Sequence, residues 1–247
     1  MSRGRDLTGL GLMPEDGQVA EHRFELAVGD EQVPGLLWIP SGNHEPGPAI
    51  LIGHGRGGHK RDRYSLGLAH RLVRQHGWAA VALDAPAHGE RRDPRADPEE
   101  TPPRPDLPQV AQEWRACVDF IGSQPVIDSS ALGYWGVSMG ASMGIAFLAA
   151  DPRVRCAVLG LMHRRYEQVR LDAPRVSCPV LFLLQWDDAR VPRGEGFELF
   201  DAIGSRDKRL HAQPGGHGDL PDEEITAAGE FFARYLGGGA AFPAASA

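Results

Sequence analysis

The residue of this chain best placed for covalent chemistry is Ser138, in the pattern Gly-x-Ser-x-Gly at 136–140. An apolar stretch at 132–137 precedes the serine, and a helix-forming run at 141–150 follows it. On a sharp strand-to-helix turn, the residues two positions away from the serine must lack side chains, so the two glycines suit such a turn. The free N–H groups of the helix would then point at an oxyanion beside the serine. The pattern therefore predicts a nucleophilic serine for acyl transfer.

A second serine competes for this role, because the same pattern recurs at 140–144 around Ser142. With 31 glycines in 247 residues, chance alone supplies the pattern in roughly one such chain in six. Ser142 would lie one turn inside the helix, and no strand directly precedes its first glycine. The strand–turn–helix context therefore favours Ser138 over Ser142.

Other reactive side chains also follow apolar stretches that are typical of strands. These residues are His54, Asp84, the adjacent pair Asp187 and Asp188, and His217. Parallel strands end at one edge of a sheet, and open α/β sheets bind their ligands at that edge. A hydroxyl, a carboxylate and an imidazole are therefore expected to lie together there, in the chain order Ser, Asp, His.

The elements that must position these groups alternate along the chain. Strands are predicted at 22–28, 33–39, 49–52, 78–83, 132–137, 157–162, 180–185 and 209–213, and helices at 64–76, 108–122, 141–150, 195–203 and 222–236. This alternation predicts an α/β fold with a mostly parallel sheet of about eight strands and helices on both faces. The first two strands read as an antiparallel hairpin. One domain at 21–236 is expected, between an irregular arm at 1–20 and a disordered tail at 237–247.

Five motifs, in this order, resemble those of the α/β-hydrolase superfamily, and most of all its dienelactone-hydrolase-like and small serine esterase branch. They are His-Gly-Arg-Gly-Gly at 54–58, Asp-Ala-Pro-Ala-His-Gly at 84–89, Gly-Val-Ser-Met-Gly at 136–140, Asp-Ala-Arg-Val-Pro at 188–192 and Gly-His-Gly at 216–218. The resemblance covers about residues 20–236. Dienelactone hydrolases use a cysteine nucleophile, so the serine here moves the expected activity toward ordinary ester hydrolysis.

The resemblance implies a catalytic triad of Ser138, Asp188 and His217. The family's spacing to the following valine and proline favours Asp188 over Asp187, which would point to the opposite side of an extended segment. The resemblance also implies an oxyanion hole made by the backbone N–H groups of Met139 and Arg56. A rival base, His211, lies within a strand pattern and is interpreted as structural.

The site is expected to be open, with little or no cap domain. Two segments could cover it, and the first, 91–106, is rich in proline and charge, which favours an extended loop over a helical cap. The connection between the strands at 157–162 and 180–185 is short. The candidate substrate-lining residues are His54, Met162, His163 and Tyr166. A core or surface role is an equal alternative for the last three, and His54 is interpreted as a structural hydrogen-bonding residue of its loop rather than a second base.

Composition excludes several classes of function. The formal net charge of −7 argues against nucleic-acid binding. The three cysteines match neither a disulfide framework nor a metal motif, and no metal or cofactor is expected. No secretory signal or membrane-spanning segment is predicted, so a cytoplasmic enzyme is the default. The expected partner is a small-molecule ester, and the oligomeric state stays open.

Three other functions remain compatible with these motifs. A peptidase or amidase, or an acyltransferase, would use the same triad and differ in the leaving group or the acceptor. A non-catalytic binding protein of the same fold is the third alternative.

Overall fold

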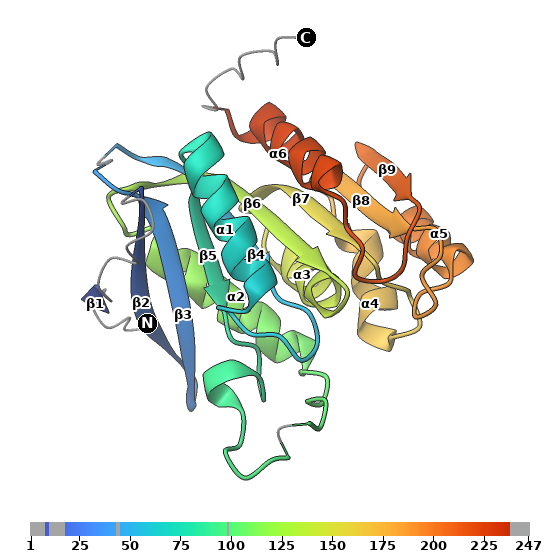
Figure 1. Ribbon diagram of the computed structural model, residues 1–247, viewed down its shortest axis with the longest axis horizontal. Helices are drawn as coiled ribbons and strands as arrows, with labels where there is room; N and C mark the ends of the chain where they lie inside the picture. The colour runs from blue at the N-terminus through green and yellow to red at the C-terminus, as the bar shows by residue number, and fades with distance from the viewer. Residues whose placement is uncertain (1–7, 10–17, 43–44, 98, 238–247) are drawn as a thin grey trace.

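The computed structural model describes residues 8–9, 18–42, 45–97 and 99–237. Its centre is a nine-stranded sheet with the order β1-β2-β3-β5-β4-β6-β7-β8-β9 (Figure 1). The strands are β1 (Thr8–Gly9), β2 (Val19–Val28), β3 (Glu31–Pro40), β4 (Gly47–Gly53), β5 (Ala79–Leu83), β6 (Ile127–Val137), β7 (Val154–Gly160), β8 (Val180–Gln185) and β9 (Lys208–Gln213). The helices are α1 (Arg63–His76), α2 (Leu107–Ile121), α3 (Met139–Ala150), α4 (Glu167–Asp172), α5 (Arg193–Ala202) and α6 (Asp222–Leu236).

Strand directions confirm the predicted mostly parallel sheet with an antiparallel hairpin at its N-terminal side. Strands β2 and β3 pair antiparallel, and β3 also pairs antiparallel with β5. From β5 through β9 every neighbouring pair is parallel. The carboxyl ends of these parallel strands therefore share one edge of the sheet, where the reactive residues are expected.

The two chain ends differ from the prediction or lie outside the described part. Within the arm at 1–20 that was predicted to be irregular, strand β1 pairs antiparallel with β2. Most of the rest of that arm, and residues 238–247 of the predicted disordered tail, lie outside the described residues. A two-residue strand carries no alternating pattern that a sequence reading could detect.

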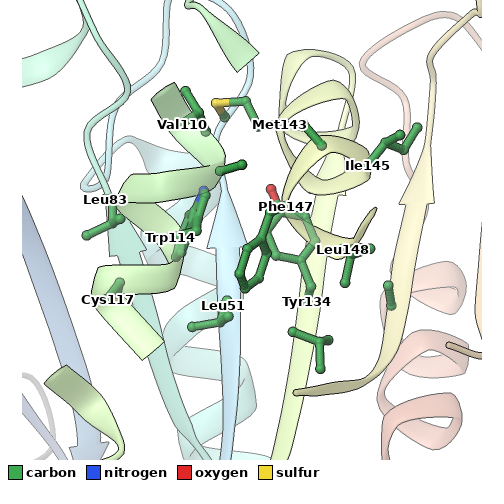
Figure 2. Close-up of a cluster of buried hydrophobic side chains, with 14 of the residues drawn as sticks. Leu51, Leu83, Val110, Trp114, Cys117, Tyr134, Met143, Ile145, Phe147 and Leu148 are labelled. Atoms are coloured by element: carbon green, nitrogen blue, oxygen red, sulfur yellow. The ribbon is translucent and has the colours of Figure 1, made fainter. Parts of the chain in front are cut away.

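Helices cover both faces of the sheet, as predicted. Helices α1 and α6 pack on one face, where Figure 1 shows them in front of the sheet. Helices α2 to α5 contribute to the core on the other face. Figure 2 shows the centre of that second core, where Trp114 of α2, Tyr134 of β6 and Phe147 of α3 pack together. Strands buried on both faces explain the continuous apolar runs of β4 and β8.

The segments that could cover the site are small. The connection between β7 and β8 holds the six-residue helix α4 and a short 3₁₀ turn at Ala173–Arg175. Helix α4 was not predicted, because its few buried side chains give no helical periodicity. The loop 92–106 contains no helix among its described residues. Nor does any described helix have the length and apolar character needed to cross a membrane.

Candidate active site

Ser138 stands on a strained turn between β6 and α3. Its φ of 56° and ψ of −123° are rare for a residue with a side chain. A Cβ on Gly136 would lie 2.4 Å from the Gly140 carbonyl oxygen, and one on Gly140 would lie 2.2 Å from the Gly53 carbonyl oxygen. Backbone packing therefore requires both glycines of the motif. The Ser138 N–H donates to the Gly160 carbonyl at 2.9 Å, which ties the turn to β7.

Tyr134 supports this turn from below, and the sequence analysis missed it. Its hydroxyl donates to the Gly140 carbonyl at 2.8 Å, and its ring meets Trp114 edge-on with centroids 5.7 Å apart. Burial raises the pKa of Tyr134, so the hydroxyl stays a donor. A Cβ on Gly144 would lie 2.2 Å from the tyrosine ring. The signal available in the sequence is a tyrosine within a buried strand, since such a hydroxyl needs a partner.

The structure brings Ser138, His217 and Asp188 into one chain of hydrogen bonds. His217 Nε2 lies 2.9 Å from Ser138 Oγ, and His217 Nδ1 lies 2.6 Å from Asp188 Oδ2. The Asp188 side chain is 1% exposed and the His217 side chain 16% exposed. The second carboxylate oxygen, Asp188 Oδ1, accepts the N–H groups of Arg190 at 2.8 Å and Val191 at 3.0 Å. These two hydrogen bonds therefore orient the carboxylate independently of its contact with the imidazole.

The rival residues are engaged elsewhere. Asp187 accepts the Gly215 N–H at 3.3 Å and so braces the loop that carries His217. His211 Nδ1 contacts Glu224 Oε2 at 3.0 Å. The buried hydroxyl of Ser142 donates to the Met139 carbonyl at 2.7 Å, inside its own helix.

The two backbone N–H groups that the resemblance assigns to an oxyanion hole have no acceptor among the described residues. The N–H groups of Met139 and Arg56 donate to no protein group in the described part of the chain. Met139 is the first residue of α3, where the helix dipole adds partial positive charge. The Arg56 side chain turns toward the loop 92–106, where its Nε donates to the Pro102 carbonyl at 2.9 Å.

His54 has a structural position rather than a place on the surface of the site. Its Nε2 accepts the Ala85 N–H at 3.1 Å, so the proton is on Nδ1, which donates to the Gly55 carbonyl at 2.9 Å. The side chain is fully buried. His54 thus joins the Arg56 loop to the end of β5, and the expectation that it lines the substrate site is corrected.

Burial of His54 predicts a dependence of stability on pH. Burial lowers the pKa of His54 from 6.5 to about 4 in the folded protein, so between these values the unfolded chain binds more protons. The free energy of unfolding is therefore expected to fall as pH falls from 6.5 to 4, by up to about 1.4 kcal/mol per pH unit from this residue. Urea unfolding of the wild type and of His54→Gln between pH 4 and 6.5 measures this pH dependence of the free energy of unfolding.

The His54→Gln variant separates this residue from the other histidines that act in the same direction. Burial also lowers the pKa of His76, His88 and His163, so the wild-type slope contains their contributions. His54→Gln should show a shallower slope than the wild type. Equal slopes in the two proteins would contradict the assignment.

A buried ion pair, which the sequence analysis did not foresee, holds the same loop from its other end. The fully buried Asp84 carboxylate accepts Lys60 N at 2.8 Å, Lys60 Nζ at 2.6 Å and Glu90 N at 2.9 Å. Gly89, at φ 54°, leaves room for it, because a Cβ there would lie 2.3 Å from this carboxylate. Asp84 thus joins the segments that carry Lys60 and Glu90. Within the described ranges no three His, Cys, Asp or Glu side chains are grouped as a metal site.

The remaining candidate lining residues divide into two groups. Met162 is a buried residue of the core, which favours a packing role over its assignment to the lining. Tyr166 contacts both His163, whose ring centroid lies 4.8 Å from its own, and Arg104, whose guanidinium carbon lies 3.9 Å from the ring centroid. The second contact joins the loop 92–106 to the segment before α4.

Comparison with known proteins identifies the family. No protein-family model matches the chain. A cold-adapted esterase from an Arctic intertidal metagenomic library is 34% identical, with a TM-score of 0.79, over 93% of this chain and 99% of that one. Dienelactone hydrolase from Anabaena variabilis shares the fold at 22% identity, with a TM-score of 0.70, over 89% of this chain and 99% of that one. An uncharacterized protein of Mycobacterium tuberculosis is 26% identical over 206 residues, 75% of this chain and 68% of that protein. The chain therefore belongs to the α/β-hydrolase superfamily and, within it, to a family of esterases that includes the Arctic enzyme.

Proposed function

We propose that this ester hydrolase acts on carboxylic esters of small to medium size through an acyl-serine intermediate. The observation that carries the proposal is the chain of hydrogen bonds from Ser138 Oγ through His217 to Asp188, at 2.9 and 2.6 Å. The two N–H groups assigned to the oxyanion hole support the same chemistry. Its substrate, under this proposal, is a small-molecule ester.

The first half of the reaction acylates the serine. His217 Nε2 accepts the hydroxyl proton as Ser138 Oγ attacks the ester carbonyl carbon, because an unassisted serine is too weak a nucleophile. Asp188 fixes the imidazole tautomer and stabilises the imidazolium that forms. The N–H groups of Met139 and Arg56 donate to the oxyanion of the tetrahedral intermediate. The bond from the carbonyl carbon to the alkoxy oxygen then breaks, and His217 gives its proton to the departing alcohol.

The second half repeats these steps with water. His217 takes a proton from a water molecule that attacks the acyl carbon, and the same N–H groups hold the second oxyanion. The bond to Ser138 Oγ then breaks, the serine recovers its proton from the imidazolium, and the carboxylic acid leaves. Each residue thereby returns to its starting protonation state.

Covalent labelling tests the proposal directly. After treatment with a fluorophosphonate, the intact protein is expected to gain the mass of one adduct, and tandem mass spectrometry should place it on Ser138. Ser138→Ala should gain none. The matched control is Ser129→Ala, which removes an exposed serine of β6 outside the site and should label at the wild-type rate. An adduct on Ser142, or no adduct, would contradict the proposal.

A further inference from the structure

We propose that a cavity beside the nucleophile binds the acyl part of the substrate, and that it takes an unbranched apolar acyl chain of medium length. The cavity holds about 440 Å³, a volume within the usual range for small-ligand sites. The inference rests on the proposed function, because it assigns the acid portion of the ester that Ser138 attacks.

The position of the cavity follows from helix α3. Ser142 lines the cavity and lies one helical turn after Ser138, because its N–H donates to the Ser138 carbonyl at 3.3 Å. Side chains of a helix also tilt toward its N-terminus, so the Ser142 end of the cavity lies toward the turn that holds Ser138. The other walls come from the start of α2 and from α4, which lie on the two sides of α3.

The walls of the cavity are largely apolar. Pro105, Leu107 and Pro108 line it from the start of α2, and Tyr166 and Leu171 line it from the α4 side. The Leu171 side chain is 56% exposed, the largest exposed fraction among the big apolar residues of the described chain. An acyl chain in the cavity would cover apolar surface of this kind, and such burial is favourable.

Three polar side chains that line the cavity already have hydrogen-bond partners in the protein. Ser142 donates to Met139 O at 2.7 Å, and Gln168 donates to Asp172 Oδ2 at 2.7 Å. Asp106 accepts the Gln109 N–H at 3.1 Å as the cap of α2. Ser142, Gln168 and Asp106 therefore place little demand on a ligand for hydrogen bonds. The Arg104 guanidinium carbon lies 3.9 Å from the centroid of the Tyr166 ring.

The charge of the cavity also argues against an anionic acyl chain. Arg104 is accompanied by two carboxylates in the lining, those of Asp106 and Glu167. A carboxylate at the end of the acyl chain would be repelled by these two groups and would have to compete with Tyr166 for the guanidinium. A hydrocarbon chain is not repelled by the carboxylates and does not compete for the guanidinium.

Chain-length dependence of hydrolysis is the test. For p-nitrophenyl esters, kcat/KM is expected to rise from acetyl through butanoyl to hexanoyl, by about threefold to fourfold per buried methylene. The hemi-adipoyl ester has the same chain length as hexanoyl but ends in a carboxylate, and it should be hydrolysed more slowly. A flat or falling chain-length profile, or faster hydrolysis of the hemi-adipoyl ester, would overturn the proposal.

A variant pair locates the effect in this cavity. Leu171→Ala is expected to lower the ratio of hexanoyl to acetyl kcat/KM by at least about threefold, because it removes an apolar wall. Phe197→Ala is the matched control, since Phe197 is a comparably exposed apolar residue, 37% exposed, on α5 outside this lining. That control should keep the wild-type ratio. A ratio measured within one preparation does not depend on the amount of folded enzyme.

Failure of this inference and failure of the proposed function give different results. If Ser138→Ala is inactive but Leu171→Ala keeps the wild-type ratio, the acyl chain binds elsewhere and only the present inference fails. If Ser138→Ala hydrolyses every ester at the wild-type rate, the proposed function itself fails. A ratio that falls equally in Leu171→Ala and Phe197→Ala also overturns the assignment to this cavity.

Discussion

Replacement of Ser138 by alanine is expected to lower kcat for p-nitrophenyl butanoate by at least about 10⁴-fold. The change removes the oxygen that forms the acyl bond, while the oxyanion donors and the binding site remain in place. Residual hydrolysis would then come from those donors and a water molecule activated by His217. Steady-state kinetics at neutral pH measure the effect, with KM expected to change far less than kcat.

The strained turn at Ser138 makes a stability control necessary. Alanine at this position keeps a Cβ and loses only the hydroxyl, so the thermal midpoint should stay within a few degrees of the wild type. Ser129→Ala, on the exposed end of β6, should retain wild-type kcat and KM. Turnover by Ser138→Ala within tenfold of the wild type would exclude a covalent role for this serine.

The sequence predicts the parallel sheet well because its signals are local. Runs such as 49–52 and 180–185 are continuous apolar stretches, and burial on both faces of a sheet requires that composition. The positions of the candidate site residues follow from the same logic, since Asp188 and His217 follow strands β8 and β9. The rule that parallel strands end at one edge of the sheet is enough to predict that these two residues lie near Ser138.

The parts that the sequence did not reveal depend on contacts between distant segments. Lys60 pairs with Asp84 across 24 positions, and Arg91 binds Glu113 across 22 positions. Neither pair has a sequence pattern, because ion pairs between loops obey no periodicity. His54 appeared as a possible lining residue for the same reason: its partner, Ala85, lies on another strand's loop.

Backbone strain is another feature that the type of a single residue does not predict. In the described part of the chain, the residues other than glycine with positive φ are Ala87, Ser138 and Leu161. Each follows the carboxyl end of a parallel strand, respectively β5, β6 and β7. Such conformations persist only where the surroundings hold them, and they gather at functional sites. Alanine and leucine favour no such turn, so only the packed structure reveals these two.

Replacement of Asp188 by asparagine is expected to lower kcat by about 10⁴-fold with little loss of stability. Asp188 Oδ1 accepts the N–H groups of Arg190 and Val191, and the asparagine oxygen would keep those two bonds. Its NH₂ group would therefore face His217 Nδ1, which must then accept and leave its proton on Nε2. An Nε2 that carries a proton cannot take one from Ser138. Steady-state kinetics together with a thermal melt separate this tautomer effect from unfolding.

The adjacent carboxylate supplies the control for that argument. Asp187→Asn makes the same chemical change one residue away, where the carboxylate accepts the Gly215 N–H at 3.3 Å. An asparagine oxygen can keep this bond, so the cost in kcat should be a few-fold at most. If both asparagine variants lose activity equally, the loop as a whole matters and not the charge behind His217. A loss confined to Asp188→Asn assigns the effect to the carboxylate that lies 2.6 Å from the imidazole.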